Sequence, residues 1–338
     1  MKRLQKFVKI WWKSLIQDPS GVAGGPNIVI LGGGSGLAVA LRGLKKYSTN
    51  ITAVVTMSDD GASTGKLRDE MGILPPGDIR KCIASLADEE PLLTKLFEYR
   101  FKNGKSLSGH SFGNLFLAAM TDISGSFEEA VAQTSRILAI SGQVMPATLA
   151  NVTLGAELEN GNIIWGESKI PLHAHKSPVK KIMLKPSKIR PFEPVIETIK
   201  KADIIIIGPG SLYTSIVPNL LIKEIRDSIS FSKASKIYVC NISTERGETE
   251  NMGVREHLEI IRKYGGSKIC NKILINSKII KEEQEGELGK IKNISLSSDK
   301  LQKIEVYTTD LINPKNPLYH DSTKLAQAII SFSVKKGL

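Results

Sequence analysis

The segment Asn27–Leu37, with the sequence NIVILGGGSGL, constrains the fold of this chain more than any other. Apolar residues typical of a buried strand run directly into Gly32–Gly36, and a helical pattern follows. This order brings backbone N–H groups and the positive end of a helix to one place, where a phosphate can bind. Leu37 occupies the place of the third glycine of the dinucleotide fingerprint, and no Gly-Lys-Ser/Thr closes a P-loop. The turn predicts a phosphorylated or nucleotide ligand, against the alternative of a ligand-free β–α turn.

The rest of the chain repeats this order of strand, loop and helix. Strand patterns fall at 27–31, 51–57, 204–207, 236–241 and 272–276, and helical patterns at 37–46, 91–101, 111–122, 126–138, 194–201, 254–264 and 322–332. The run Ile204–Ile207 is typical of a strand buried on both faces of a parallel sheet. Asn160-Gly161 predicts a hairpin between 151 and 169. The fold class is therefore α/β.

The first residues differ from the rest in charge. Residues 1–14 carry five basic residues and no acid, and the apolar residues fall near helical spacing: Leu4, Phe7, Val8, Trp11 and Trp12. This predicts a basic amphipathic helix rather than a secretory signal, because lysines interrupt every apolar run. The helix can dock on the body or on a partner, or residues 1–20 can make peripheral contact with a membrane. We expect a leader and linker over 1–25 and one α/β domain over 26–338.

The composition limits the classes of partner and the redox compartment that we expect for this protein. The net charge of +12 favours anionic partners, but no aromatic-basic interleaving, helix-turn-helix or zinc-finger pattern predicts nucleic-acid binding. Three widely spaced cysteines without metal-ligand spacing suggest a reducing compartment. No Gly-x-Ser-x-Gly elbow, Cys/His pair or metal-spaced histidine set is present, so no catalytic residue is assigned.

Two polar turns come next along the chain. Asp59 and Asp60 follow the second strand, where an acid can contact a ribose or, as a pair, hold Mg²⁺ against phosphates; a solvated capped turn is the alternative. Pro75–Arg80 reads as a rigid turn. In it, Asp78 would reach a ligand hydroxyl or metal, or would only cap the next helix, and Arg80 would bind a phosphate.

Two further segments complete the candidate site. His110 stands just before a helix that Ser111 can cap, with Asn114 four residues on, which suits a ligand-contact or acid–base role as well as a structural one. A second glycine turn follows the strand 204–207 and offers backbone donors, hydroxyls and a ring for a phosphate, base or sugar: Gly210, Ser211 and Tyr213. Both glycine turns should lie at the edge of the sheet where ligands bind.

Seven ordered segments carry a family resemblance: GGGSGL, SDDGASTGKLR, PPGDIRKC, GHSFGNLFLAAM, GESKI, ADIIIIGPGSLYTSIVPNLL and IYVCNISTERGETE. They resemble the signature segments of the YvcK-like proteins, the gluconeogenesis-factor relatives of the CofD phospholactate transferases. The resemblance runs from about Asn27 to the C-terminal helix. The chain departs from the usual family residues at Ala62, Thr64, Lys66, Arg246 and Tyr319.

The resemblance implies a Rossmann-like three-layer α/β/α fold and a cytoplasmic protein that binds nucleotide sugars such as UDP-N-acetylglucosamine. It links the chain to carbon metabolism, cell shape and peptidoglycan synthesis, with cell-wall synthesis proteins as partners; a homo-oligomer is left open. The implied ligand-binding residues are Gly33, Gly34, Ser35, Asp59, Asp60, Asp78, Arg80, His110, Asn114, Gly210, Ser211 and Tyr213.

Two hypotheses for function remain after these observations. The first is a UDP-sugar-binding regulator without robust catalysis and with no required cofactor. The second is a transferase of the CofD type that moves a phospho-acyl group from a nucleotide diphosphate carrier, with Mg²⁺ on Asp59 or Asp60. NAD(P)-dependent redox chemistry fits less well, because the glycine fingerprint is imperfect.

Overall fold

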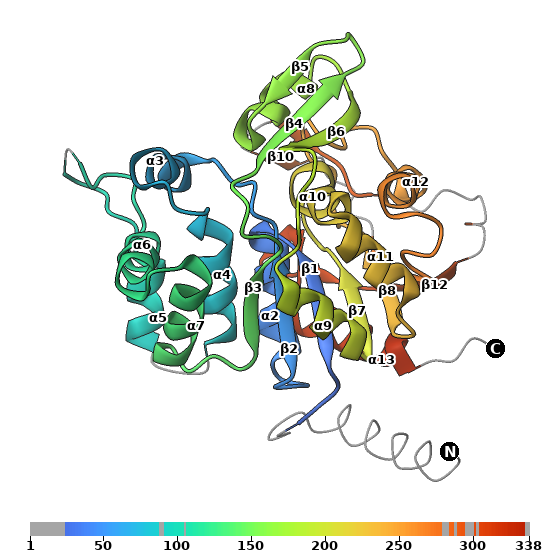
Figure 1. Ribbon diagram of the computed structural model, residues 1–338. Coiled ribbons are helices and arrows are strands. Elements are labelled where there is room, and N and C mark those ends of the chain that lie inside the picture. The colour runs from blue at the N-terminus through green and yellow to red at the C-terminus, as the bar shows by residue number, and fades with distance from the viewer. Residues whose placement is uncertain are drawn as a thin grey trace.

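A seven-stranded sheet forms the centre of the computed structural model, which describes residues 24–87, 91–104, 106–278, 284–286, 289–294, 301 and 304–334 (Figure 1). Its strands are β1 (Ile28–Gly32), β2 (Ile51–Val55), β3 (Gln143–Pro146), β7 (Ile204–Ile207), β8 (Ser235–Val239), β9 (Lys272–Asn276) and β12 (Glu305–Thr309). They lie in the order β12-β9-β8-β7-β1-β2-β3, and every pair is parallel. The predicted α/β class with a parallel sheet is confirmed.

The central strands are apolar along their whole length because helices cover both of their faces. Successive β1 side chains point to opposite faces, so Ile28 and Ile30 belong to one core cluster and Val29 and Leu31 to the other. Every residue of the run Ile204–Ile207 is buried, as the sequence predicted.

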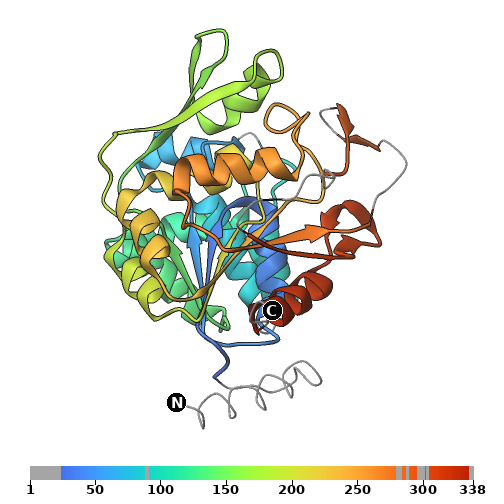
Figure 2. The ribbon, with the colours of Figure 1, turned by 90° about the vertical axis from the view of Figure 1, so that its right-hand side faces the viewer.

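Two helical layers complete the three-layer fold (Figure 2). One layer shares a core with Ile28 and Ile30 and contains α2 (Gly34–Leu44), α4 (Pro76–Leu86), α6 (Phe112–Ser124), α7 (Phe127–Ile137) and α13 (Ser322–Val334). The opposite layer shares a core with Val29 and Leu31 and contains α9 (Glu193–Lys201), α10 (Val217–Leu221), α11 (Lys223–Phe231) and α12 (Val254–Gly265). The expected α/β/α layering is confirmed.

A small antiparallel sheet stands above the carboxyl ends of the parallel strands, at the top of Figure 1. It has the order β5-β4-β6 and consists of β4 (Thr153–Leu158), β5 (Ile163–Trp165) and β6 (Val179–Lys185). The β4–β5 turn contains Asn160-Gly161, and Gly161 N–H donates to Leu158 C=O over 2.9 Å. The hairpin prediction is confirmed. The one-turn helix η1 (Glu167–Lys169) and α8 (Ile170–Ala174) follow β5.

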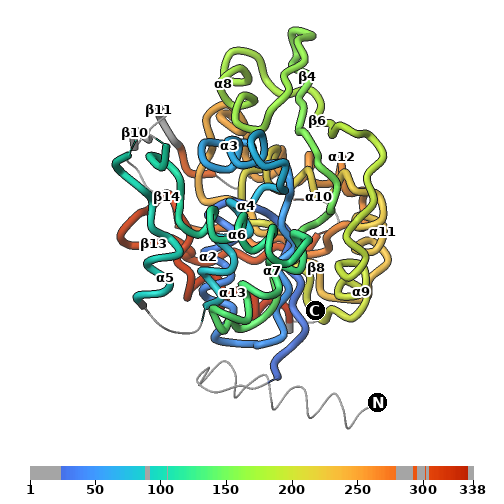
Figure 3. The backbone as a smooth tube through the Cα atoms, turned by 60° about the vertical axis from the view of Figure 1, so that its left-hand side comes forward, coloured from blue at the N-terminus to red at the C-terminus, as the bar shows by residue number. Residues whose placement is uncertain are grey.

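Shorter elements complete the described chain, and Figure 3 shows α3 and α8 together at the carboxyl edge of the sheet. They are α3 (Ala62–Met71), α5 (Pro91–Glu98), the π-helical turn η2 (Leu212–Ile216), β10 (Gln284–Gly286), β11 (Gly289–Ile291), β13 (Ile312–Asn313) and β14 (Asn316–His320). The predicted turn Pro75–Arg80 is wrong, because Pro76 begins α4 and places Asp78 and Arg80 on a helix. Proline favours the first position of a helix, where its missing N–H costs nothing.

The strand order turns around between β1 and β7. From β1 the chain continues outward through β2 and β3, and it returns to β7 on the other side of β1. In sheets of this kind the carboxyl ends of the two strands that flank such a reversal form the usual ligand crevice. In the described part of the chain, no helix is long and apolar enough to cross a membrane. The predicted leader helix lies outside the described residues.

Candidate functional site

The two glycine turns predicted from sequence lie against each other at the strand reversal. A Cβ atom on Gly36 would come within 2.8 Å of Pro209 C=O, and a Cβ on Gly210 within 3.1 Å of Gly33 C=O. The first distance leaves no room for a side chain at Gly36, and the second is tighter than most Cβ contacts. Gly34 (φ +67°) and Gly210 (φ +156°) also adopt backbone conformations that L-residues with side chains disfavour. The sequence therefore builds one continuous backbone-lined surface from two distant segments.

The first turn presents the amino end of α2. The Gly34 N–H donates to Asp78 Oδ2 over 2.7 Å. The amides of Ser35 and Gly36 come next, and within the described residues neither donates to an acceptor. Ser35 is exposed. Because free amides at a helix amino end attract anions, this turn can receive a phosphate beside the Asp78 carboxylate.

Asp78 reaches this turn from the first turn of α4. Its Oδ1 accepts from Lys81 Nζ over 2.9 Å, so both carboxylate oxygens are engaged within the protein. Asp59 follows β2, and its Oδ1 accepts from Gly61 N–H over 2.9 Å. Burial, and then the charge of Asp78, raise the pKa of Asp59 above its ordinary value.

Asp60 connects the segment after β2 to the start of η1. Its carboxylate accepts from the Glu167 N–H over 3.0 Å and from the Ser168 N–H over 2.8 Å. These amides begin η1, so Asp60 satisfies a helix end that lies more than 100 residues away in sequence. Asp59 and Asp60 thus have different partners within the protein, and Mg²⁺ binding by this pair stays a prediction. Among the described residues, no group of three metal-ligating side chains is present.

Arg80, His110 and Asn114 form a single buried network. Arg80 Nε donates to Asn114 Oδ1 over 3.1 Å, and Asn114 Nδ2 donates to Ser63 Oγ over 3.2 Å. Ser63 Oγ also lies 3.1 Å from His110 Nδ1. Ser111 caps α6 as predicted, since its Oγ accepts from Asn114 N–H over 3.1 Å. The structure thus brings the three predicted residues together and adds Ser63 of α3, which the sequence reading missed.

The second turn is fixed by residues that follow β8. Asn241 Oδ1 accepts from Gly210 N–H over 3.1 Å, and Asn241 Nδ2 donates to Gly210 C=O over 2.9 Å and to Glu245 Oε1 over 3.0 Å. Glu248 accepts from Tyr213 N–H over 2.9 Å and from Thr214 Oγ1 over 2.7 Å. The shape of the turn therefore depends on the segment Asn241–Glu248.

Tyr213 and Ser211 differ in what they offer a ligand. The Tyr213 side chain is only 5% exposed and packs in the core, so it leaves little ring surface for the stacking that the sequence suggested. Burial is also the main reason that the pKa of Tyr213 rises to about 12. Ser211 is half-buried at the amino end of η2 and keeps the position expected of a ligand contact.

Three acidic residues missed by the sequence reading complete the surroundings. Burial, followed by the charges of Asp59, Asp78 and Asp60, raises the pKa of Glu167 to about 8. Burial, followed by the charge of Glu245, raises the pKa of Glu248 to about 8, and burial raises the pKa of Glu245. Glu167 and Glu248 both hydrogen-bond to Thr214. Near neutral pH, the protonated forms of Glu167 and Glu248 can donate hydrogen bonds.

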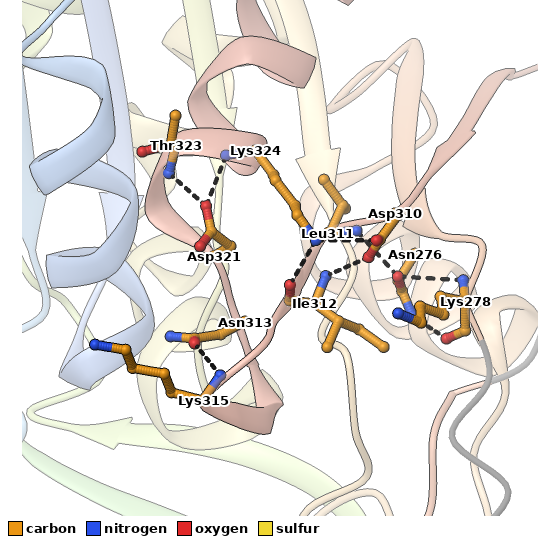
Figure 4. Close-up of polar contacts among 10 residues, drawn as sticks. All are labelled: Asn276, Lys278, Asp310, Leu311, Ile312, Asn313, Lys315, Asp321, Thr323 and Lys324. Carbon is orange, nitrogen blue, oxygen red and sulfur yellow. Dashed lines mark hydrogen bonds and ion pairs between the residues drawn. The ribbon is translucent and has the colours of Figure 1, made fainter.

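Polar contacts connect the segments Asp310–Lys315 and Asp321–Lys324, on either side of Tyr319 (Figure 4). Asp321 Oδ1 accepts from the amides of Thr323 and Lys324, each over 2.9 Å, which caps α13. Lys324 Nζ reaches Asp310 Oδ2 over 2.9 Å. Burial lowers the pKa of His320 to about 4, so this side chain is a neutral core group, whereas Tyr319 is 48% exposed.

Comparison with known proteins agrees with this architecture. The family profile "2-phospho-L-lactate transferase CofD" matches residues 28–312. The gluconeogenesis factor of Bacillus subtilis is 43% identical over 310 residues, covering 90% of this chain and 97% of that protein. A relative from Nostoc sp. is 54% identical over 255 residues, or 75% of this chain and 56% of that protein. A crystal structure of a Bacillus halodurans protein superposes with a TM-score of 0.86 at 40% identity, covering 90% of this chain and 99% of that one.

The fold and the paired glycine turns define a three-layer α/β protein of the Rossmann-like type, with both turns at a strand reversal, where sheets of this kind usually bind ligands. Within that class, the match to the CofD profile and the 43% identity to the Bacillus subtilis protein identify the family. The chain belongs to the CofD family and, within it, to the gluconeogenesis-factor, or YvcK-like, proteins.

Proposed function

We propose that this protein binds a nucleoside diphosphate sugar, of the UDP-N-acetylglucosamine kind, across the two glycine turns. The observation that carries the proposal is the close approach of Gly33–Gly36 to Gly208–Gly210 at the strand reversal, with the Ser35 and Gly36 amides free among the described residues. A diphosphate has two anionic groups: the free Ser35 and Gly36 amides of the first turn would bind one of them, whereas the Gly208 and Gly210 amides of the second turn already donate to Leu31 C=O and Asn241 Oδ1. Lys81 supplies a cation beside the first turn.

The groups around the turns suit the rest of such a ligand. Protonated Glu167 is a hydrogen-bond donor that adds no negative charge next to a diphosphate. The buried Arg80–Asn114–Ser63 network holds α3, α4 and α6 together, so that Asp59 and Asp78 keep their positions. These polar groups would select a ligand by its sugar hydroxyls and amide, since an unmatched buried polar group costs about 1–3 kcal/mol.

We propose a regulatory role for this binding in the cytoplasm, in carbon metabolism and in control of cell shape and peptidoglycan synthesis. The name gluconeogenesis factor carried by the Bacillus subtilis relative supports the link to carbon metabolism. Cell-wall synthesis proteins are the proposed partners. The proposal requires no bound metal, and comparing ligand binding with and without Mg²⁺ tests this.

The second candidate function is group transfer from a nucleotide diphosphate carrier, as the name of the CofD family suggests. The raised pKa of Asp59 favours it, since burial and then the charge of Asp78 raise this pKa, and perturbed acidic groups are common where chemistry occurs. A Mg²⁺ ion on Asp59 and Asp60 would share the Asp60 oxygens with the Glu167 and Ser168 amides at the start of η1.

One experiment separates the two functions. The pure protein is titrated with UDP-sugars, with guanosine diphosphate conjugates and with NAD(P), and the same mixtures are assayed for new products with and without Mg²⁺. We expect saturable binding of a UDP-sugar without turnover. Turnover of a diphosphate conjugate would establish the transferase instead, and preferential binding of NAD(P) would reject both.

A further inference from the structure

Arg68 on α3 connects the loop after β2 to the small sheet. Its guanidinium makes three hydrogen bonds. Nη1 donates to Asp59 C=O over 2.8 Å, and Nη2 donates to Asn151 Oδ1 over 2.6 Å and to Val152 C=O over 2.8 Å. Asn151 and Val152 directly precede β4, and Figure 3 shows α3 next to the small sheet. One side chain thus holds a residue of the candidate site and the start of the small sheet.

The residue next to Asp59 holds the other end of the β4–β5 hairpin. Asp60 accepts from the Glu167 and Ser168 amides over 3.0 and 2.8 Å, just after β5 ends. The chain passes close to this carboxylate, because a Cβ atom on Gly166 would lie 2.9 Å from Asp60 Oδ2. Two adjacent residues, Asp59 and Asp60, therefore anchor both ends of the hairpin.

Asp59 is in turn packed against the first turn of α4. A Cβ atom on Gly77 would lie 2.5 Å from Asp59 Oδ2, and the next residue is Asp78, which accepts from Gly34 N–H. A displacement of the Asp59 backbone would therefore move its carboxyl against α4 and the first glycine turn. Contacts run without a gap from the small sheet through Arg68 and Asp59 to that turn.

The chemistry of arginine suits this connection. A guanidinium is planar and has five N–H donors, so it can bind acceptors on two segments at once. A lysine ammonium at the end of a flexible stem does not present donors in this fixed geometry. Arg68 is also half-buried, which limits competition from water for its three acceptors.

We propose that Arg68 is a positioning residue that couples the candidate ligand site to the small sheet. Through its guanidinium, the placement of Asp59 and the docking of β4 become one cooperative unit. Coupling between two sites is reciprocal, so a ligand that fixes the first glycine turn and Asp59 also orders the small sheet. The ligand in this statement rests on the proposed function, whereas the coupling itself is a property of the free protein.

Hydrogen exchange of backbone amides, followed by NMR in the free full-length protein, tests the connection. Arg68→Ala should speed the exchange of amides in β4, β5 and β6 by about tenfold or more, and Arg68→Lys should restore part of the protection. Lys66→Ala is the matched control: it removes a cation from the same helix, and within the described chain the exposed Lys66 side chain makes no hydrogen bond or ion pair. Equal exchange in Arg68→Ala and Lys66→Ala would overturn the proposal.

A change on the small-sheet side separates coupling from a purely local role of Arg68. Asn151→Ala removes one exposed acceptor of the guanidinium. We expect it to speed the exchange of the Gly61 amide, which donates to Asp59 Oδ1, and to add nothing in the Arg68→Ala background. Unchanged Gly61 exchange in Asn151→Ala would overturn the coupling. This comparison also decides the question if Arg68→Ala does not fold.

UDP-N-acetylglucosamine provides the test with ligand. At saturation it should slow the exchange of the small sheet in the wild-type and Lys66→Ala proteins. Arg68→Ala should lose this protection and bind about tenfold more weakly. Full protection of the small sheet in ligand-bound Arg68→Ala would overturn the coupling. If the wild-type protein does not bind the UDP-sugar, the proposed function fails, and the measurements on the free protein still decide the role of Arg68.

Discussion

The Asp78 carboxylate accepts a 2.7 Å hydrogen bond from the Gly34 amide, the first N–H of α2. The protein thus places its own anion at one donor of the predicted phosphate turn. The second oxygen of Asp78 binds Lys81, so a cation stands directly beside the carboxylate. If the turn binds a phosphate, as we propose, the next amides, those of Ser35 and Gly36, are the donors that remain for it.

Gly34→Val should weaken ligand binding about tenfold or more, equivalent to about 1.4 kcal/mol. The side chain would fill the space that the phosphate needs, at a residue with φ +67°. Titration calorimetry measures the change. Gly72→Val is the matched control, because Gly72 has φ +66° and no neighbouring atom within 4 Å of the added Cβ, at the end of α3. Equal affinities in the folded Gly34→Val and Gly72→Val proteins would refute the phosphate-turn assignment.

Asn114→Ala should lower the free energy of unfolding by about 1–3 kcal/mol. The substitution removes the partner of the buried Arg80 Nε and one partner of Ser63 Oγ. Urea unfolding followed by circular dichroism measures the effect. Asp122→Ala, an exposed change on the same helix, should alter stability by less than about 0.5 kcal/mol. If the two variants unfold at the same urea concentration, the network does not stabilise the fold.

Raised glutamate pKa values should make the protein less stable as the pH rises from about 5 to 8. Glu248 has a pKa of about 8 in the folded chain against 4.5 ordinarily, so between these values the folded state holds a proton that the unfolded state has lost. The contribution of this proton to the free energy of unfolding is fully present below pH 4.5 and is lost as the pH rises through 8. One such proton changes the free energy of unfolding by at most about 1.4 kcal/mol per pH unit.

Glu248→Gln isolates this contribution, because the amide stays neutral and can still accept from Tyr213 N–H. We expect a flatter dependence of unfolding free energy on pH in urea titrations at pH 5.5, 7 and 8.5. Glu197→Gln serves as the control, since that exposed side chain has a lowered pKa. An unchanged pH slope in Glu248→Gln would contradict the buried, protonated state of Glu248.

Local patterns predicted much of the fold. The strand at Ile204–Ile207, the Asn160-Gly161 turn and the Ser111 cap all appear where the sequence placed them, since each depends on neighbouring residues. The position of both glycine turns at one sheet edge followed from the rule for parallel sheets.

Long-range contacts account for what the sequence did not predict. Glu167 comes close to Asp59 and Thr214 only because the small sheet folds over the carboxyl edge of the parallel sheet. No local residue spacing predicts this long-range contact. The sequence of α3 is polar and has no helical spacing of apolar residues, so its pattern resembles that of a loop. The helix begins at Ala62 with φ +38°. Burial of Tyr213 likewise depends on the core packing around η2 and not on the turn sequence.

Titration of the full chain with UDP-N-acetylglucosamine tests the central claim most directly. Calorimetry should show saturable binding, and ligand at 100 times its Kd should raise the free energy of unfolding by about 2.7 kcal/mol, because it binds only the folded protein. The folded Gly34→Val protein should lose most of this effect at the same ligand concentration. No heat and no stabilisation at millimolar UDP-sugar would contradict the proposed function.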